Sequence, residues 1–312
     1  MRFCNLICAI AVNYMVFLVF RILTAVVSGT VVSISMTYAE DVASIPEHIP
    51  GVIAGVFSGF SVASVVGVPI ASTITQTFGW RAAFITIFVA TLALLALLFV
   101  KLPRQNRLKA GSILEQFKLF LDKRISIGCA IVFLAGASTY CFYTYLTPIF
   151  QQELHIPDSM LSLALLIFGI AAITSNVSSG QVANKTGIRM LPLIYIIQTV
   201  CLLLLPIATH NLISGGLVLF ILGVMMYLLN SPLQMHFLNI ATREHPACVN
   251  LASSLISVFF NFGIAAGSAM GGVIVKYAGL RFVGIGGAVP GIGAIICAVI
   301  LLQIMKPGAD IR

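Results

Sequence analysis

The chain has 312 residues, of which 60% are hydrophobic and 8% are charged, and its formal net charge is +8. Soluble domains carry about 25% charged residues, so this composition excludes a soluble enzyme, a nucleic-acid-binding protein and a disordered scaffold. What remains is a polytopic membrane protein, because its apolar runs of about 20 residues suit helices that cross the hydrocarbon core of a bilayer.

The apolar pattern predicts nine full membrane spans and one partial span. The partial span covers Phe3–Val12, which is too short to cross a bilayer, and it ends at an Asn13-Tyr14 turn. We therefore expect the chain to begin inside a helix whose first half is missing. The full spans are predicted at 15–38, 51–76, 82–101, 125–147, 159–181, 189–208, 212–238, 249–275 and 282–305.

The longest polar stretch runs from Lys101 to Arg124 and holds 7 of the 17 basic residues. Lysine and arginine concentrate in cytoplasmic loops, and counting spans outward from this stretch divides the basic residues 12 to 3 between the two sides. We expect this stretch and the C-terminus to be cytoplasmic in a multi-pass protein of the plasma or inner membrane. Ser112 and Glu115 have capping-box spacing, which predicts a short amphipathic helix on the membrane surface, with a solvated linker as the alternative.

Arg21 is the only charge well inside a predicted span. Such an arginine is a functional candidate, and the small face formed by Thr24, Ala25 and Ser28 favours a water-filled cavity. The alternative is that Arg21 snorkels to the membrane surface. None of the nine acidic residues lies inside a span, although a proton-driven carrier usually has a membrane carboxylate.

Several uncharged polar side chains lie within predicted spans and are candidates to line a cavity. Apolar walls with a few polar anchors suit a small organic ligand. The alternative for each residue is a hydrogen bond between two helices. The candidates are Tyr140, Tyr143, Thr144, Asn176, Asn230, Gln234 and Asn261.

The span at 51–76 carries a small residue at every fourth position from Gly51 to Ala71. Small residues at this spacing let a partner backbone approach, so we expect Gly59 and Gly67 to pack closely against another helix. Pro69 removes a backbone hydrogen bond from the same helix and permits a bend. The second half of the chain repeats the stripe at Gly263, Gly267 and Gly271.

The first half of the chain repeats in the second half at a shift of about 200 residues. The repeat predicts two similar helical bundles, an incomplete one over 1–101 and a six-helix one over 125–312, joined by the basic linker 102–124. Two similar bundles joined by a basic linker are the layout of a transporter with parallel repeats. Transporters of this kind bind their substrate between the halves, near the middle of the bilayer. The matched residues are Glu40 with Glu244, Gly59 with Gly263, Gly67 with Gly271, and Gly79-Trp80-Arg81 with Gly279-Leu280-Arg281.

Four segments resemble motifs of the major facilitator superfamily and of its drug/proton antiporters. Residues 20–29 resemble the fourth-helix motif, in which a glycine follows an arginine by eight residues. Gly59…Gly67-Val68-Pro69 resembles the fifth-helix antiporter motif, and residues 79–84 resemble the start of the sixth helix. Residues 180–189 resemble the second-half copy of the cytoplasmic gating motif. The resemblance implies an all-α bundle of two pseudo-symmetric halves.

The resemblance also implies roles for residues at the cytoplasmic ends of helices. Gly180, Lys185, Gly187 and Arg189 match the gating motif, whose usual aspartate is Asn184 here. Glu40 or Asp41 resembles the acidic partner of the first gating motif, and Glu244 is its counterpart in the second half. The family has twelve spans, so the chain is expected to lack helices one, two and half of helix three.

The activity that the resemblance implies is export of a drug-like compound, sugar or purine in exchange for protons. This reading makes the chain a monomeric secondary transporter in a lipid bilayer, with no cofactor, no metal and no enzymatic activity. The alternative is a truncated product that inserts but does not transport. A membrane enzyme would need a cluster of histidine, aspartate or glutamate at one membrane face, and the sequence shows none.

Overall fold

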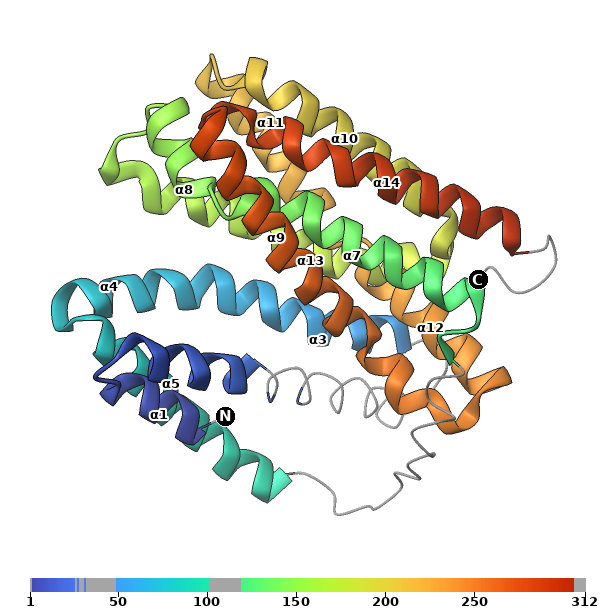
Figure 1. Cartoon of the computed structure of the whole chain (residues 1–312), viewed down its shortest axis with the longest axis horizontal. Coiled ribbons are helices and arrows are strands. Elements are labelled where there is room, and N and C mark those ends of the chain that lie inside the picture. Colours follow the sequence, from blue (N-terminus) through green and yellow to red (C-terminus); the bar gives the residue numbers. More distant parts are fainter. Residues whose placement is uncertain (1, 26, 28–30, 32–48, 102–118, 306–312) are drawn as a thin grey trace.

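The computed structural model describes residues 2–25, 27, 31, 49–101 and 119–305, which form helices and turns with no strand among them (Figure 1). The first part holds α1 (Arg2–Ile10), a helix over Tyr14–Ala25, α3 (Ile49–Val62), the π-helix η2 (Ala63–Gly67), α4 (Val68–Phe78) and α5 (Trp80–Lys101). The second part holds α7 (Lys123–Tyr143), α8 (Leu146–Pro148), η3 (Ile149–Glu153), α9 (Asp158–Lys185), η4 (Gly187–Met190), α10 (Leu191–Ala208), α11 (Leu212–Met225), α12 (Asn230–Glu244), η5 (Pro246–Cys248), α13 (Val249–Tyr277), η6 (Leu280–Phe282) and α14 (Val283–Ile304).

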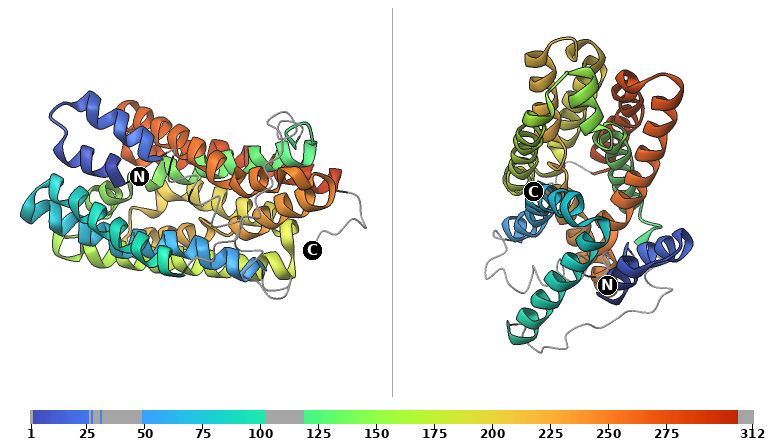
Figure 2. Two further views of the ribbon diagram at one scale, coloured as in Figure 1. Left: turned by 90° about the horizontal axis from the view of Figure 1, so that it is seen from below. Right: turned by 90° about the vertical axis from the view of Figure 1, so that its left-hand side faces the viewer.

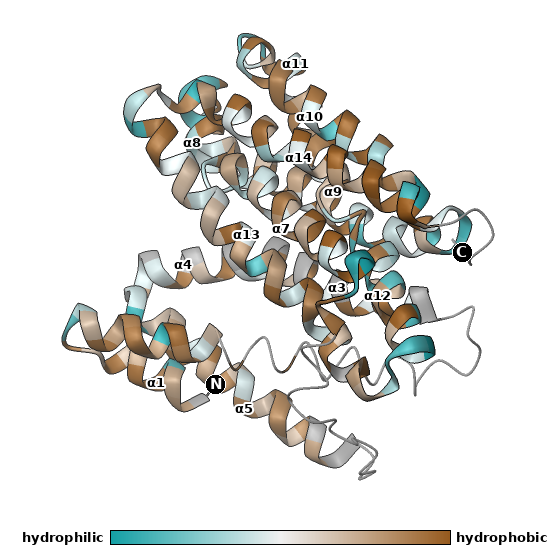
Figure 3. Ribbon diagram, turned by 45° about the vertical axis from the view of Figure 1, so that its right-hand side comes forward, coloured by the Kyte–Doolittle hydropathy of each residue, from teal (hydrophilic) through white to brown (hydrophobic). Residues whose placement is uncertain are grey.

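Seven helices in the described part of the chain are long and apolar enough to cross a membrane. The predicted span at 51–76 is built from α3, η2 and α4, and the span at 15–38 is described as a helix over Tyr14–Ala25. Figure 3 shows apolar residues along most helices and polar ones gathered near helix ends and turns. The predicted fold class, an all-α polytopic membrane protein, is confirmed.

The helices of the second part form a closed bundle in which α7 packs on both α13 and α14. In order around the bundle, α7 packs on α13, and α13 packs on α12; α12 packs on α9, α9 on α11, α11 on α10, α10 on α14, and α14 on α7 again. Tyr195 and Phe237 are completely buried between these helices. The bundle therefore has a core of its own.

The first part makes two separate groups of contacts. Phe17, on the Tyr14–Ala25 helix, packs edge to face against Trp80 and Phe84 of α5, with ring centroids 5.8 Å and 5.5 Å away. Helix α3 instead packs on α9 and α12 of the second part. Figure 2 shows the resulting arrangement, with α1 and α5 lying side by side and apart from the second-part bundle.

The glycine stripe of the second part lies in the contact between α13 and α7. Gly263 packs against the backbone at Gly136, and Gly267 packs against Ala137. A methyl group added to Gly271 would lie 2.6 Å from the carbonyl oxygen of Cys141. The two backbones therefore meet as closely as small residues allow.

The glycine stripe of the first part does not pack in this way. A Cβ atom added to Gly51, Gly55, Gly59 or Gly67 would meet nothing within 4 Å among the described residues. The predicted packing of Gly59 and Gly67 against a partner helix therefore has no counterpart among the described residues and stays a prediction. In the described contacts α3 turns a neighbouring face inward, and the Ile53 side chain enters the buried core.

Helix geometry changes just before Pro69. Residues Ala63–Gly67 form a π-helical turn, and α4 then begins with Pro69 in its first turn. Proline lacks the backbone N–H that would bond to the preceding turn, and π-turns are a common way to absorb such a fault. The equivalent helix in the second part, α13, runs without interruption for 29 residues.

Candidate functional site: an aromatic cluster beside a broken helix

Four half-buried aromatic side chains meet in the second part of the chain. We call them the aromatic cluster: Tyr140, Tyr143, Tyr227 and Phe260. The Tyr140 ring lies 5.2 Å from Tyr143 and 5.9 Å from Phe260 between centroids. Tyr227 lies 6.1 Å from Phe260, and its hydroxyl is 3.5 Å from that of Tyr140. The cluster joins α7 and α13 to the turn between α11 and α12.

Tyr227 lies where a membrane helix is broken. Helix α11 ends at Met225 and α12 begins at Asn230, because Pro232 has no N–H to offer the carbonyl of Leu228. Within this break, the N–H of Tyr227 donates to the Ser175 hydroxyl of α9, at 2.9 Å. Irregular backbone at membrane depth is tolerated where protein satisfies it, and broken helices of this kind often form the substrate sites of transporters.

Two predicted cavity residues, Asn176 and Asn230, bond to each other. The Asn230 side-chain amide donates to the Asn176 oxygen at 2.7 Å, and both side chains are buried. The hydroxyls of Ser179 and Ser231 pair nearby at 2.8 Å. These bonds join α9 to the first turn of α12, just after the helix break. The structure therefore brings the two asparagines together as a helix–helix contact.

The other predicted polar residues have different partners. The Thr144 hydroxyl lies 2.8 Å from that of Ser268, which links the end of α7 to α13 beside the aromatic cluster. Gln234 is fully buried and donates to the Ser253 carbonyl at 3.4 Å. Asn261 is exposed and donates to the Ser257 carbonyl of its own helix.

Arg21 lies in the first part of the chain. Its side chain is exposed, and its guanidinium carbon is 5.6 Å from the centre of the Phe84 ring of α5. This is a cation–π contact with a helix on the same side of the molecule. Within the described residues, the structure places Arg21 with α1 and α5 and not with the aromatic cluster.

The residues that resemble the gating motif lie at the end of α9. Gly180 is buried and lines a pocket of about 270 Å³ between α3 and α9, together with Gly51 and Gly55. Gly187 has a φ of +57° in the turn to η4, a conformation that favours glycine. Lys185 and Arg189 are exposed. Glu40, Asp41 and the predicted amphipathic helix lie outside the described residues.

Glu244 forms an ion pair with Arg124, which the sequence analysis did not single out. Arg124 Nη1 donates to Glu244 Oε1 at 2.8 Å and its Nε donates to Asp122 at 3.0 Å. Asp122 also caps α7 by accepting the Arg124 backbone N–H at 2.8 Å. Burial by itself raises the pKa of the Asp122 carboxyl, but the hydrogen bonds from Arg124 outweigh it and hold that pKa below its usual value.

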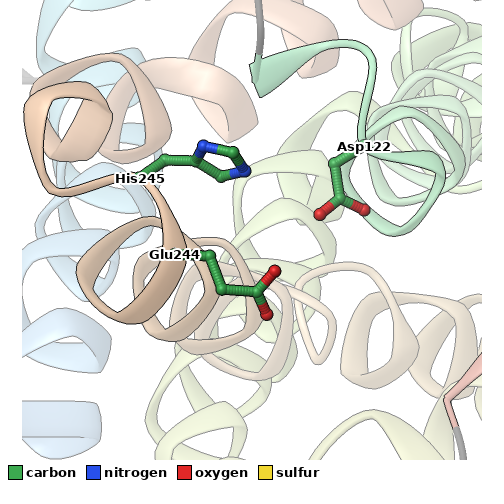
Figure 4. A group of neighbouring side chains, drawn as sticks. All are labelled: Asp122, Glu244 and His245. Atoms are coloured by element: carbon green, nitrogen blue, oxygen red, sulfur yellow. The ribbon is translucent and has the colours of Figure 1, made fainter.

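The same corner of the bundle gathers three groups that could bind a metal. Asp122, Glu244 and His245 have ligand atoms within 4.8 Å of one another (Figure 4). The sequence shows no such cluster, because Asp122 lies more than 100 residues away from Glu244 and His245 along the chain. However, the Arg124 guanidinium bonds both carboxylates and compensates their charge, so the arrangement suits an ion pair between α7 and α12 better than a cation site.

Sequence reasoning missed two members of the aromatic cluster. Tyr227 precedes Asn230 by three residues, so helical spacing could have placed both on one face. Phe260 directly precedes Asn261, but nothing in the apolar pattern of this span distinguishes it from its neighbours. Arg124 and Glu244 are 120 residues apart, and no local signal pairs them.

Comparison with known proteins gives the same picture. Residues 1–250 match the family described as Major Facilitator Superfamily. The chain is 30% identical over 296 residues to the uncharacterized MFS-type transporter YtbD of Bacillus subtilis (strain 168), covering 94% of this chain and 74% of that one. It is 28% identical over 231 residues to a probable sugar efflux transporter of Pasteurella multocida (strain Pm70), covering 74% and 56%.

A solved structure has the same fold. The human organic anion transporter MFSD10 (TETRAN) superposes with a TM-score of 0.69 at 13% identity, covering 95% of this chain and 74% of that one. The family match covers most of the chain, and the helical bundle agrees with it. The chain therefore belongs to the major facilitator superfamily of membrane transporters.

Proposed function

We propose that the chain exports a small organic solute, such as a drug-like compound, a sugar or a purine, in exchange for protons. The observation that carries the proposal is the aromatic cluster at the break between α11 and α12. Aromatic faces supply apolar contact, while the Tyr140 and Tyr227 hydroxyls supply polar anchors. The likeness to a probable sugar efflux transporter supports the direction of transport.

The first part of the chain meets the second where α3 packs on α9 and α12. In this proposal the two parts rotate relative to each other about this contact, and the pocket beside Gly180 changes its shape as they do so. The parts correspond to residues 1–101 and 125–312, with 102–124 as a cytoplasmic linker, and the protein acts as a monomer. Arg21 takes part by electrostatics, because an arginine keeps its charge at every relevant pH.

Orientation can be tested separately from transport. A cysteine introduced at Gln105 is expected to stay unlabelled by an impermeant reagent added outside intact cells, because the basic linker is proposed to be cytoplasmic. The same cysteine should react once the membrane is permeabilised. Ready labelling in intact cells would reverse the proposed topology.

The transport test uses the protein in liposomes with an imposed pH gradient and a panel of neutral sugars, nucleosides and drug-like compounds. Tyr227→Ala and Tyr140→Ala are expected to lower transport at least about tenfold, as expected when anchoring contacts of about 1.4 kcal/mol are lost. Tyr195→Phe is the matched control, because this tyrosine is buried outside the cluster. Unchanged transport in both alanine variants would remove the cluster from the site.

A second candidate function is insertion in the membrane without transport. The observation that favours it is that the Trp80–Leu97 window of α5 has none of its residues buried, while Gly59 and Gly67 have no neighbour within 4 Å of an added Cβ among the described residues. The two candidates differ in one measurement: a non-transporting chain inserts and folds but moves no solute under any gradient. In that case Arg21→Ala has no effect on transport, because the parent chain transports nothing.

A further inference from the structure

The long helices of the second part carry their charged side chains only in their first or last turn. Helix α7 has Lys123 and Arg124 at its start, and α9 has Asp158 as its first residue and Lys185 as its last. Helices α12 and α13 carry theirs in the last turn. Helices α10, α11 and α14 contain no lysine, arginine, aspartate or glutamate. The middle of each long helix is therefore uncharged.

The aromatic cluster lies away from the Arg124 end of the bundle. Tyr140 and Tyr143 are in the last turn of α7, whereas Arg124 is in its first turn. Phe260 lies near the middle of α13. The histidine of α12, His236, faces the Arg124 carbonyl at 3.4 Å. The ion pair of Arg124 and this histidine therefore belong to the opposite end of α7 from the cluster.

Four charged side chains lie at the end of the bundle where α7 ends: Glu153, Asp158, Lys276 and Arg281. Asp158 accepts from the side-chain amide of Gln151 at 2.8 Å, and Arg281 Nε donates to the Pro206 carbonyl at 2.8 Å. Lys276 lies over the Tyr277 ring. Within the described residues, the partners of Asp158, Arg281 and Lys276 therefore lie in end turns and not in the aromatic cluster.

The polar groups beside the cluster are hydroxyls, and they form two pairs. The Tyr140 hydroxyl lies 3.5 Å from that of Tyr227, and one helical turn further along α7 the Thr144 hydroxyl lies 2.8 Å from that of Ser268. Bonds between hydroxyls are usually about 2.8 Å long, so the tyrosine pair is loose and can take up a hydroxyl of a solute. Each of these groups both donates and accepts a hydrogen bond.

Aromatic faces complete the set of groups that a solute would meet. Tyr143 stacks on Phe168 with ring centroids 5.7 Å apart, next to the four rings of the cluster. The face of an aromatic ring is its electron-rich side and attracts the C–H groups of a saturated ring. The nearby amides of Asn176 and Asn230 are buried and bond to each other. The recognition groups are therefore rings and hydroxyls.

We propose that the solute bound at the aromatic cluster is an uncharged ring molecule with several hydroxyl groups, such as a monosaccharide. A carboxylate or an ammonium group would lose water here without gaining an ion-pair partner, which is costly. A purely apolar ring would leave the two hydroxyl pairs without a new partner, whereas the hydroxyls of a sugar match both. The inference rests on the proposed function, because it takes the aromatic cluster as the solute site.

The test measures binding and needs no gradient. The whole chain, purified in detergent, is dialysed at about pH 6 against radiolabelled glucose, galactose and mannose, and against the amino sugar and the uronic acid of each. Each series keeps the ring and changes the charge, because the amine is a cation and the carboxyl an anion at that pH. We expect at least one neutral sugar to bind, and its two charged relatives to bind at least about tenfold more weakly.

Thr144→Val tests the hydroxyls, because it removes one of them and keeps the branched shape. Affinity for the neutral sugar is expected to fall about three- to tenfold. Thr174→Val is the matched control. Its hydroxyl also bonds to a carbonyl four residues earlier, that of Ile170, but it lies on α9 and pairs with no second helix. Equal affinities in the two variants would contradict the role of the hydroxyl pairs, and the sugar series in the parent chain does not depend on either variant.

The proposal is overturned if no neutral sugar binds, or if the amino sugars bind more tightly. Tighter binding of adenine, an uncharged ring without hydroxyls, would overturn it too. Tighter binding of the uronic acids would overturn it and would point to Arg21 as the partner of a carboxylate. Failure of the proposed function looks different. A sugar that binds but is not moved in liposomes under a pH gradient removes export and leaves this inference, whereas export of a charged solute keeps export and removes the inference.

Discussion

Two stripes of small residues with the same four-residue spacing differ in their packing: one lies against another helix, and the other has no such partner among the described residues. In α13, Gly263, Gly267 and Gly271 lie against the backbone of α7. Gly59 and Gly67, their counterparts in the first part, face open space in the described residues. Spacing alone permits a close approach, but the facing helix decides whether it happens. On α7, Gly136 and Ala137 supply a surface as small as the stripe itself.

The largest effect is expected from Gly267→Leu. The added side chain would enter the backbone of α7 at Ala137, which cannot move without displacing the centre of the bundle. We expect a loss of more than about 4 kcal/mol, enough to prevent folding. Yield and thermal unfolding of purified protein in detergent measure it. A variant that folds with the parent's Tm would show that α7 and α13 are not tightly packed.

A smaller effect is expected on the other side of the same contact. A methyl group at Gly136 would lie 2.9 Å from the Phe260 carbonyl oxygen, so Gly136→Ala should cost about 1–3 kcal/mol of stability through overpacking. The thermal midpoint measures the loss. Gly216→Ala is the control, because a Cβ there meets nothing within 4 Å. Equal midpoints in the two variants would contradict the prediction.

The ion pair of Arg124 with Asp122 and Glu244, at the start of α7, tests whether the glycine stripe of α13 is the only contact that fixes the position of α7. Asp122→Asn should cost about 1 kcal/mol at pH 7, because it weakens the helix cap and the bond to Arg124. The pKa of Asp122 is lowered in the folded state, so its contribution is present above the ordinary aspartate value of about 3.9 and is lost as pH falls through the lowered value.

The measurement is the difference in thermal midpoint between the parent and Asp122→Asn as a function of pH. It should stay constant from pH 7 to pH 5 and close at lower pH. A difference that grows on acidification would mean that the carboxyl is destabilised, not stabilised, by its surroundings. No difference at any pH would leave the stripe as the main constraint on α7.

The smallest effects are expected from Gly59→Leu and Gly67→Leu. Both positions are open, so each variant should change stability by no more than about 0.5 kcal/mol. The direct comparison is with Gly263→Leu, which stands at the equivalent position in the repeat. If Gly59→Leu unfolds the protein as Gly263→Leu is expected to, the first stripe also packs against a helix in the membrane, and the contrast between the stripes disappears.

Much of the fold follows from local patterns in the sequence. Apolar runs locate the seven helices that are long enough to span in the described part of the chain, because a bilayer demands about 20 apolar residues. The positions of Gly79 and Gly279 mark equivalent turns. Helical spacing also brings Tyr140 and Tyr143 onto one face. What could not be predicted depends on rotation and partner choice between distant helices. The inward turn of α3 through Ile53, and the bond between Asn176 and Asn230, belong to this class.

The bond from the Tyr227 amide to the Ser175 hydroxyl has a mechanical consequence. A backbone N–H without a partner at membrane depth costs several kcal/mol, so α9 cannot slide by a turn past the break unless the Tyr227 N–H finds another acceptor. The turn between α11 and α12 must therefore move together with α9. Gly180 of α9 also lines the pocket beside α3. A displacement of the Tyr227 ring would therefore move α9 at its contact with α3, between the two parts of the chain.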